Sequence, residues 1–140
     1  MFGKIALLLV VPLLRVAEVQ EPLFGTWRLT SASGPSAYSR VTTKIEPWQD
    51  GVRVIYDMVG NRGGVTHWEW TGKIDGKDYP LEGIEEAVTD AYTRVDDHTY
   101  RLVLKVDGRV ATTSTIVISP DGKTMTVTSS ASNTATYTKQ

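Results

Sequence analysis

Four Asp-Gly pairs divide the chain into short runs rich in valine, isoleucine, threonine, tyrosine and tryptophan, and this spacing constrains the fold most strongly. The pairs stand at positions 50–51, 75–76, 107–108 and 121–122. Asp-Gly supplies the two positive-φ residues of a type I′ turn, so each pair predicts a tight hairpin between antiparallel strands. A looser fifth turn is expected at 61–64. After the first 20 residues no stretch keeps the apolar period of a helix for three turns, so little helix is expected there.

About ten strands follow from these turns, each linked to the next by a hairpin. Their expected ranges are 24–31, 39–47, 52–59, 65–75, 77–81, 87–95, 98–106, 109–118, 123–129 and 133–139. Short sequential strands of this number close most simply into a single up-and-down antiparallel barrel, which leaves no unpaired sheet edge. The sequence therefore predicts one all-β barrel domain over residues 21–140, with no internal linker that would divide it.

Alternation of apolar and polar residues indicates which side of each strand is buried. Trp68 and Trp70 are expected to point inward, with His67 and Glu69 in solvent. Every second residue of a later strand is expected to face the interior: Val110, Thr112, Ser114, Ile116 and Ile118. A solid core seldom places hydroxyl groups in its middle, so this face favours a barrel with a partly hydrated interior.

Composition excludes several classes of function. The 140 residues include 15 Lys and Arg against 16 Asp and Glu, a net charge of −1, and no cysteine. Such a charge balance argues against a nucleic-acid or anionic-membrane surface. The lack of cysteine excludes a disulfide scaffold, thiol catalysis, iron–sulfur clusters and Cys-type zinc sites. No glycine-rich phosphate loop is present, so nucleotide chemistry is not expected, and no cofactor is predicted.

The first 20 residues differ from the rest. Lys4 precedes an unbroken apolar run over 5–14, which is too short to cross about 30 Å of hydrocarbon but is typical of a signal peptide. Arg15 stands where a small residue would precede Ala17 at a cleavage site. We interpret 1–20 as a signal peptide of an exported protein, periplasmic or extracellular. The alternative is a retained apolar segment that packs on the domain.

A G-x-W motif at Gly25 and Trp27 resembles the opening of the calycin superfamily, the lipocalins and fatty-acid-binding proteins. In that superfamily the motif lies on the first strand and closes one end of the barrel. Residues 22–140 also resemble small exported bacterial lipocalin-like proteins of unassigned function, and the short sequence segments at 44–47, 67–70 and 75–80 contribute to this resemblance. The resemblance implies a calycin-like barrel that binds a small molecule.

Several features of these families differ in this chain. Residues 89–92 only approximate the second lipocalin motif, T-D-Y, and the last strand offers Lys139 where lipocalins bring an arginine onto the motif tryptophan. The late R-x-Y with which fatty-acid-binding proteins hold a carboxylate is missing. The eight residues 32–39 are too few for the helical lid of those proteins. The resemblance thus implies the fold rather than fatty-acid binding.

Few residues could carry catalysis. His67 and Glu69 project to the same side of a strand and could serve as metal ligands or as a base with its orienting group, or could simply form a solvated face. His98 follows two aspartates at a turn and is expected to be a surface residue. An acidic stretch lacks the spacing of a calcium loop and is expected to be a charged loop: Glu82, Glu85, Glu86 and Asp90.

Five aromatic residues on expected inward faces form the predicted ligand site: Tyr56, Trp68, Trp70, Tyr92 and Tyr100. As cavity lining they would stack against an apolar ligand, with Arg94 or Thr112 as polar handles; as plain core they need no ligand. Trp48 is expected at an exposed hairpin tip, as a rim or partner contact.

Three functions are weighed on these residues. The leading hypothesis is non-catalytic binding of a small apolar or amphipathic molecule inside the barrel. The alternative is a structural or protein-interaction module of the cell envelope, with a solid barrel that works through Trp48, the strand-tip loops or the N-terminal segment. A less favoured third is a small-barrel enzyme using His67 and Glu69. A cavity of about 300 Å³ or more would favour the first. No nucleic acid or integral membrane span is expected, and the oligomeric state stays open.

Overall fold

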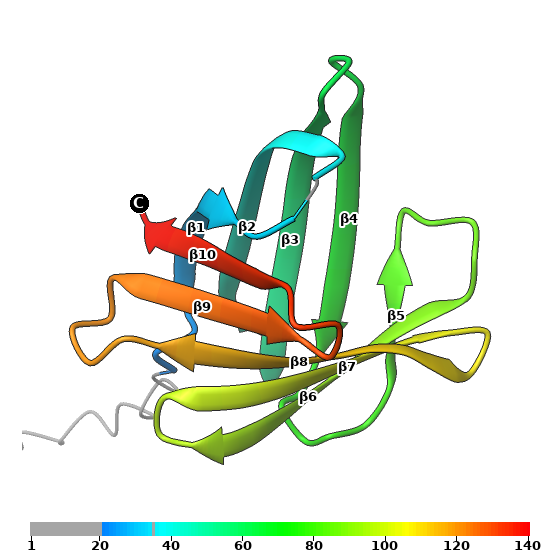
Figure 1. The fold of residues 1–140 in the computed structure, drawn as a ribbon. Coiled ribbons are helices and arrows are strands. Elements are labelled where there is room, and N and C mark those ends of the chain that lie inside the picture. Colours follow the sequence, from blue (N-terminus) through cyan, green and yellow to red (C-terminus); the bar gives the residue numbers. More distant parts are fainter. Residues whose placement is uncertain (1–20, 35) are drawn as a thin grey trace, which may run out of the picture.

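The computed structural model describes residues 21–34 and 36–140, which form a closed antiparallel barrel (Figure 1). Its ten strands are β1 (Gly25–Ala32), β2 (Tyr38–Trp48), β3 (Gly51–Gly60), β4 (Val65–Gly72), β5 (Tyr79–Glu82), β6 (Val88–Asp96), β7 (Thr99–Val106), β8 (Arg109–Ile118), β9 (Thr124–Ser129) and β10 (Thr134–Lys139). Each strand pairs with the next, and β10 closes the barrel on β1. No helix occurs in the described part of the chain. The predicted all-β up-and-down barrel is confirmed, and the predicted signal peptide at 1–20 lies outside the described residues.

Three of the four Asp-Gly pairs lie between strands, whereas Gly51 of the fourth begins β3, and only Asp107–Gly108 forms the predicted type I′ turn. Asp107–Gly108 joins β7 to β8 with φ of 49° and 77°, as a type I′ turn requires. Between β2 and β3 the turn residues are Gln49 and Asp50, one position earlier than predicted, and of these two only Gln49 has a positive φ. The pairs at 75–76 and 121–122 lie in longer loops in which only the glycine has a positive φ. The predicted turn type is therefore wrong at three pairs, although each pair marks a turn.

A β-bulge in β8 reverses one predicted side-chain direction. Leu104 of β7 pairs with Thr112, whereas the following Lys105 pairs with Val110, so Ala111 is an extra residue on β8. Val110 consequently faces solvent and is 61% exposed. The prediction that Val110 points inward is wrong, because the bulge shifts the alternation by one residue.

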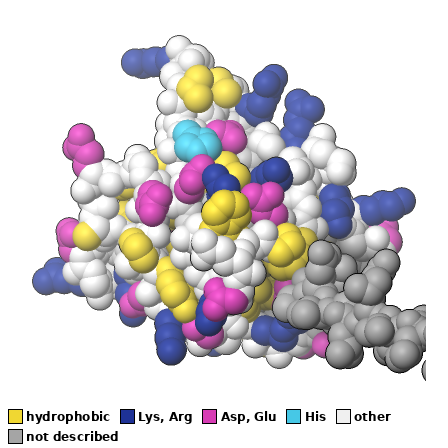
Figure 2. All heavy atoms as spheres, turned by 180° about the vertical axis from the view of Figure 1, so that it is seen from behind, with side chains coloured by type: hydrophobic (Ala, Val, Ile, Leu, Met, Phe, Trp, Pro, Cys, Tyr) yellow, Lys and Arg dark blue, Asp and Glu magenta, His cyan; other side chains and the backbone are white. Residues whose placement is uncertain are grey.

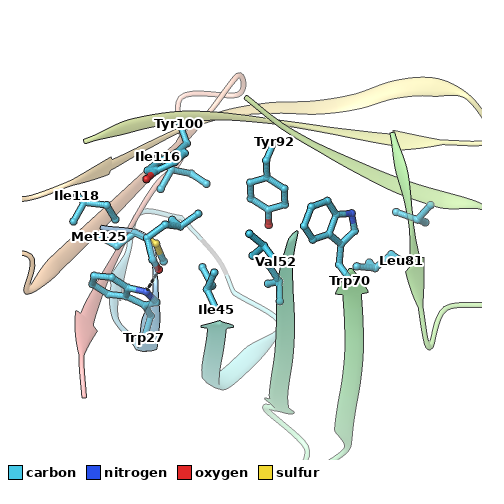
Figure 3. Close-up of a cluster of buried hydrophobic side chains, with 13 residues drawn as sticks. Trp27, Ile45, Val52, Trp70, Leu81, Tyr92, Tyr100, Ile116, Ile118 and Met125 are labelled. Carbon is cyan, nitrogen blue, oxygen red and sulfur yellow. Dashed lines mark hydrogen bonds between the residues drawn. The ribbon is translucent and has the colours of Figure 1, made fainter. Parts of the chain in front are cut away.

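One end of the barrel is filled by the buried core. Trp27 is fully buried there, and its indole N–H donates a 2.9 Å hydrogen bond to the Leu23 carbonyl. The Lys139 ammonium lies 5.5 Å from the centre of the Trp27 ring, so a lysine takes the position of the lipocalin arginine. Figure 3 shows the buried cluster that continues from this plug into the barrel: Trp27, Ile45, Val52, Trp70, Leu81, Tyr92, Tyr100, Ile116, Ile118 and Met125.

Strand pairing in the barrel is least extensive around β5. In Figure 1 the strands β1–β4 cross the direction of β6–β9, as in an orthogonally packed barrel. Between these two groups lies β5, which is registered to β4 only at Glu82 and Leu81 and to β6 only at Tyr79 and Pro80. The short β5 therefore joins the two halves of the barrel.

Candidate functional site

A hollow of about 490 Å³ lies toward the end of the barrel opposite the Trp27 plug. Its aromatic walls are Tyr38, Tyr56, Trp68 and Tyr137, from β2, β3, β4 and β10. None of the described residues that line it carries a charge. Uncharged polar side chains, among them Ser129 and Asn133, are also part of the lining, so the hollow is a mainly apolar and aromatic surface with a few polar groups, of the kind that binds small molecules.

The size of side chains explains why the hollow lies at this end. Ala32 and Ala37 flank the loop between β1 and β2, and Ala135 lies on β10 across from them. At the opposite end, the interior positions carry large residues, Trp27 and Met125 among them. Small side chains leave the volume near the β1–β2 loop unfilled, so the barrel is packed at one end and open at the other.

A buried polar group lies behind the wall of the hollow. The hydroxyl groups of Tyr56 and Tyr92 are 2.7 Å apart and share a hydrogen bond. Asp90 lies on the same inward face of β6 as Tyr92 and is 2% exposed. Its Oδ1 has no hydrogen-bond partner among the described residues. Asp90 is thus the one carboxylate in this group, and it interacts with Tyr56, whose side chain lines the hollow, while Asp90 itself is not on the wall.

Burial governs the protonation of all three groups. Burial raises the pKa of Asp90 to about 6, although the nearby Tyr56 hydroxyl partly lowers it. Burial also raises the pKa of Tyr56, with smaller increases from the neighbouring Tyr92 and Asp90. Burial likewise raises the pKa of Tyr92. Both tyrosines therefore remain hydrogen-bond donors across the physiological range, whereas Asp90 can change its charge.

The expectation that Asp90 belongs to a charged surface loop is wrong. β6 begins at Val88, and alternation from this buried residue directs residues 90 and 92 into the barrel. Sequence reasoning grouped Asp90 with nearby glutamates by charge, although the alternation of Val88 and Tyr92 was the signal that could have placed it. The group of Asp90, Tyr56 and Tyr92 is hereafter the polar group.

The five predicted aromatic residues divide between the hollow and the packed core. Tyr56 and Trp68 line the hollow, and Tyr92 lies behind Tyr56. Trp70 packs against Tyr92 with ring centroids 4.7 Å apart, and the two lie side by side in Figure 3. Tyr100 is fully buried in the cluster nearer Trp27. Trp70, Tyr92 and Tyr100 are therefore not on the wall of the hollow.

Tyr137 is an aromatic wall residue that sequence reasoning did not single out. It lies within a strand predicted at 133–139, and alternation along that strand places it on the same face as Ala135. This pattern could have identified both residues as inward-facing. The fold brings them beside Leu29 and Val127, which complete that side of the hollow.

The predicted polar handles lie elsewhere. The Arg94 guanidinium pairs with the carboxylate of Glu21 and lies 5.4 Å from the Tyr100 ring centre. The Tyr100 hydroxyl donates a 2.6 Å hydrogen bond to the same Glu21 carboxylate. Thr112 is half-buried on β8 and is not on the wall of the hollow. Arg94 is instead one part of a clamp on Glu21.

His67 and Glu69 lie on the outer face of β4, where acidic and basic side chains interleave over the barrel surface (Figure 2). The His67 Nδ1 is 2.6 Å from Asp57, and its Nε2 is 3.0 Å from Glu69. Arg53 donates a 2.9 Å hydrogen bond to the same Glu69 oxygen. With both ring nitrogens held by carboxylates, His67 has no free lone pair to offer a metal or a substrate. Among residues 21–34 and 36–140, no group of three or more His, Cys, Asp or Glu side chains is arranged so that it could hold a metal ion.

Trp48 lies at the β2–β3 hairpin, as predicted, and is 41% exposed. The Arg53 guanidinium covers its ring at 4.6 Å from the centroid. Part of the indole surface is therefore already occupied by a cation–π contact within the barrel.

Within the described ranges, no helix has the length and apolar character needed to cross a membrane.

The closed strand order defines an up-and-down antiparallel β-barrel with a hollow toward one end. No family model matches the chain, and no curated protein matches it. Among solved structures, the chain is similar to a variant of the fluorescent protein UnaG, with a TM-score of 0.59 and 18% sequence identity. The match covers 85% of this chain and 96% of the other. At this identity the likeness concerns the fold alone, and it agrees with the antiparallel β-barrel expected from the sequence.

Proposed function

We propose that this barrel binds a small apolar or amphipathic molecule in the hollow, without catalysing a reaction. The observation that carries the proposal is the apolar, aromatic hollow of about 490 Å³. Small-molecule sites typically begin at about 300 Å³ and combine apolar walls with a few polar groups. A barrel filled throughout by side chains, as the structural-module hypothesis requires, would not contain such a space.

The outer His67 group does not favour catalysis. Its imidazole is held between two carboxylates on the solvent side of β4, whereas the hollow lies inside the barrel. A general base needs a free ring nitrogen within reach of its substrate. The proposal therefore rests on the interior of the barrel and assigns no chemistry to His67.

Binding can be measured with the fluorescent dye N-phenyl-1-naphthylamine, which is neutral and brightens in apolar sites. Ala135→Phe is designed to fill the hollow from β10 and should weaken dye binding at least tenfold, which corresponds to about 1.4 kcal/mol. Val110→Phe is the matched control, because Val110 is exposed on the outer face of β8. It should leave binding unchanged.

Equal dye binding by both variants and the unmodified protein would place the dye on the surface and defeat the proposal. Thermal unfolding of each variant checks that loss of binding does not reflect loss of the fold.

We further propose that residues 1–20 direct export to the periplasm or the outside of the cell. The proposal is supported by Lys4 and the apolar run over 5–14. N-terminal sequencing of the exported protein tests it, and a folded exported product that still begins at Met1 would refute a cleaved signal peptide.

A further inference from the structure

We infer that the polar group of Asp90, Tyr56 and Tyr92 binds the polar end of the ligand, and that this end carries a hydrogen-bond donor, most favourably a protonated amine. The inference rests on the proposed function, because it specifies the ligand of the same hollow. It predicts an amphipathic ligand with an apolar body against Trp68 and Tyr137 and a donor directed toward β6.

Asp90 has unmet hydrogen-bonding capacity. Its side chain is 2% exposed, and its Oδ1 has no partner among the described residues. Buried polar atoms are nearly always hydrogen-bonded in folded proteins, and an unpartnered one costs stability. A buried carboxylate oxygen without a donor is therefore a place where a donor from outside the chain would be stabilised.

The described strands around Asp90 present no basic side chain to it. The titratable groups that face the polar group are tyrosines: Tyr79 lies opposite Asp90 on β5, and Tyr137 lies near Tyr56 and Tyr92 on β10. The Tyr79 hydroxyl already donates a 2.7 Å hydrogen bond to Asp75. On β7, the residue opposite Asp90 is the apolar Leu104. No described neighbour on these strands supplies a positive charge, so a cationic or donor group of a ligand would meet no competitor.

Tyr56 connects the hollow with the polar group. The Tyr56 side chain lines the hollow and ends in the hydroxyl that bonds to Tyr92. Each hydroxyl oxygen can accept through two lone pairs, and the shared hydrogen bond uses only one of the four, so the Tyr56 oxygen can still accept a hydrogen bond from a ligand. A ligand donor at the inner end of the hollow therefore meets the Tyr56 oxygen first and the Asp90 carboxylate behind it.

The same surroundings disfavour an anionic ligand. None of the described wall residues is basic, and an ionised Asp90 repels a second carboxylate placed near it. A fatty acid would therefore bind less well than an amine of the same chain length.

Three competitors with the same apolar chain test this inference: decylamine, decan-1-ol and decanoate, each displacing N-phenyl-1-naphthylamine at pH 8. Decylamine should bind at least tenfold more tightly than decan-1-ol, and decanoate should bind most weakly. Asp90→Asn should weaken decylamine binding at least tenfold and leave decan-1-ol unchanged. Asp97→Asn, at an exposed position on the β6–β7 turn, is the matched control and should change neither.

The outcomes separate this inference from the proposed function. If decan-1-ol competes but decylamine binds no better, or if Asp90→Asn leaves the ratio of the two affinities unchanged, the assignment of the polar end is overturned while ligand binding stands. Failure of decylamine to compete at all also overturns it. If Ala135→Phe does not weaken dye binding, the proposed function falls and this inference falls with it. Thermal unfolding confirms that Asp90→Asn is folded under the assay conditions.

Discussion

Asp90→Asn is expected to stabilise the unliganded barrel at alkaline pH. The carboxylate is enclosed by β6 and its neighbours and is 2% exposed, with no partner for Oδ1 among the described residues. Asparagine has nearly the same shape as protonated aspartic acid but carries no charge. The substitution therefore removes the cost of burying a charge while it keeps the packing.

The magnitude follows from the pKa of Asp90, which burial raises from 3.8 to about 6. A tenfold change in proton affinity corresponds to about 1.4 kcal/mol, so the ionised form costs the fold roughly 3 kcal/mol. Below pH 3.8 the carboxyl is protonated in both the folded and the unfolded chain, and the cost is absent. It grows as the pH rises from about 4 to about 6, because the unfolded chain ionises first, and it stays constant above that range.

Urea unfolding followed by tryptophan fluorescence at pH 4 and pH 8 measures this effect. Asp90→Asn should be about as stable as the unmodified protein at pH 4 and more stable by roughly 3 kcal/mol at pH 8. Asp97→Asn controls for the loss of one negative charge and should show no such difference. An Asp90→Asn variant that is equally or less stable at pH 8 would refute the argument that the carboxylate is destabilised by burial.

Three further predictions concern the framework of the barrel. Gly25→Ala should lower the free energy of unfolding by about 1–3 kcal/mol in urea, because Gly25 has a φ of 152°, which other residues rarely adopt. Hydrogen bonds with Asp57, and to a smaller extent with Glu69, raise the pKa of His67. In Asp57→Asn this pKa should fall toward 6.5, as measured by an NMR titration. Its contribution to stability is present below pH 6.5 and is lost as the pH rises through the raised pKa. Glu21→Ala and Tyr100→Phe should together cost about 1 kcal/mol less than the sum of their separate effects in a double-mutant cycle, since each removes the same hydrogen bond.

The strand order could be predicted because turn residues and alternation are local signals. Each Asp-Gly pair marked a break between strands, and the runs between them had the composition of strands. The type of turn depends on pairing as well, which is why the hairpin after β2 turns at Gln49 and Asp50 rather than at the Asp-Gly pair. The bulge at Ala111 likewise arises from the register between β7 and β8, and nothing in the local sequence of β8 marks it.

The candidate site could be predicted only in part. Alternation correctly directed Tyr56 and Trp68 inward, but it does not tell a packed interior from a hollow one. That difference depends on small side chains from distant strands, such as Ala32 and Ala135, meeting at one end of the barrel. Asp90 was misplaced because it was grouped by charge with the preceding glutamates, and charged residues are ordinarily exposed, although it falls within the strand predicted at 87–95; the closure of the barrel encloses it.

The two shielded carboxylates of this barrel differ in a way that points to the ligand. The Glu21 side chain is 7% exposed, but it pairs with the Arg94 guanidinium and accepts a hydrogen bond from the Tyr100 hydroxyl. Its burial is therefore offset by groups of the fold itself. Asp90 is buried more deeply, and its Oδ1 has no such partner in the described chain. A leucine or valine would fill an interior strand position without this cost, so an aspartate beside a hollow is better explained by what enters the hollow than by the stability of the barrel.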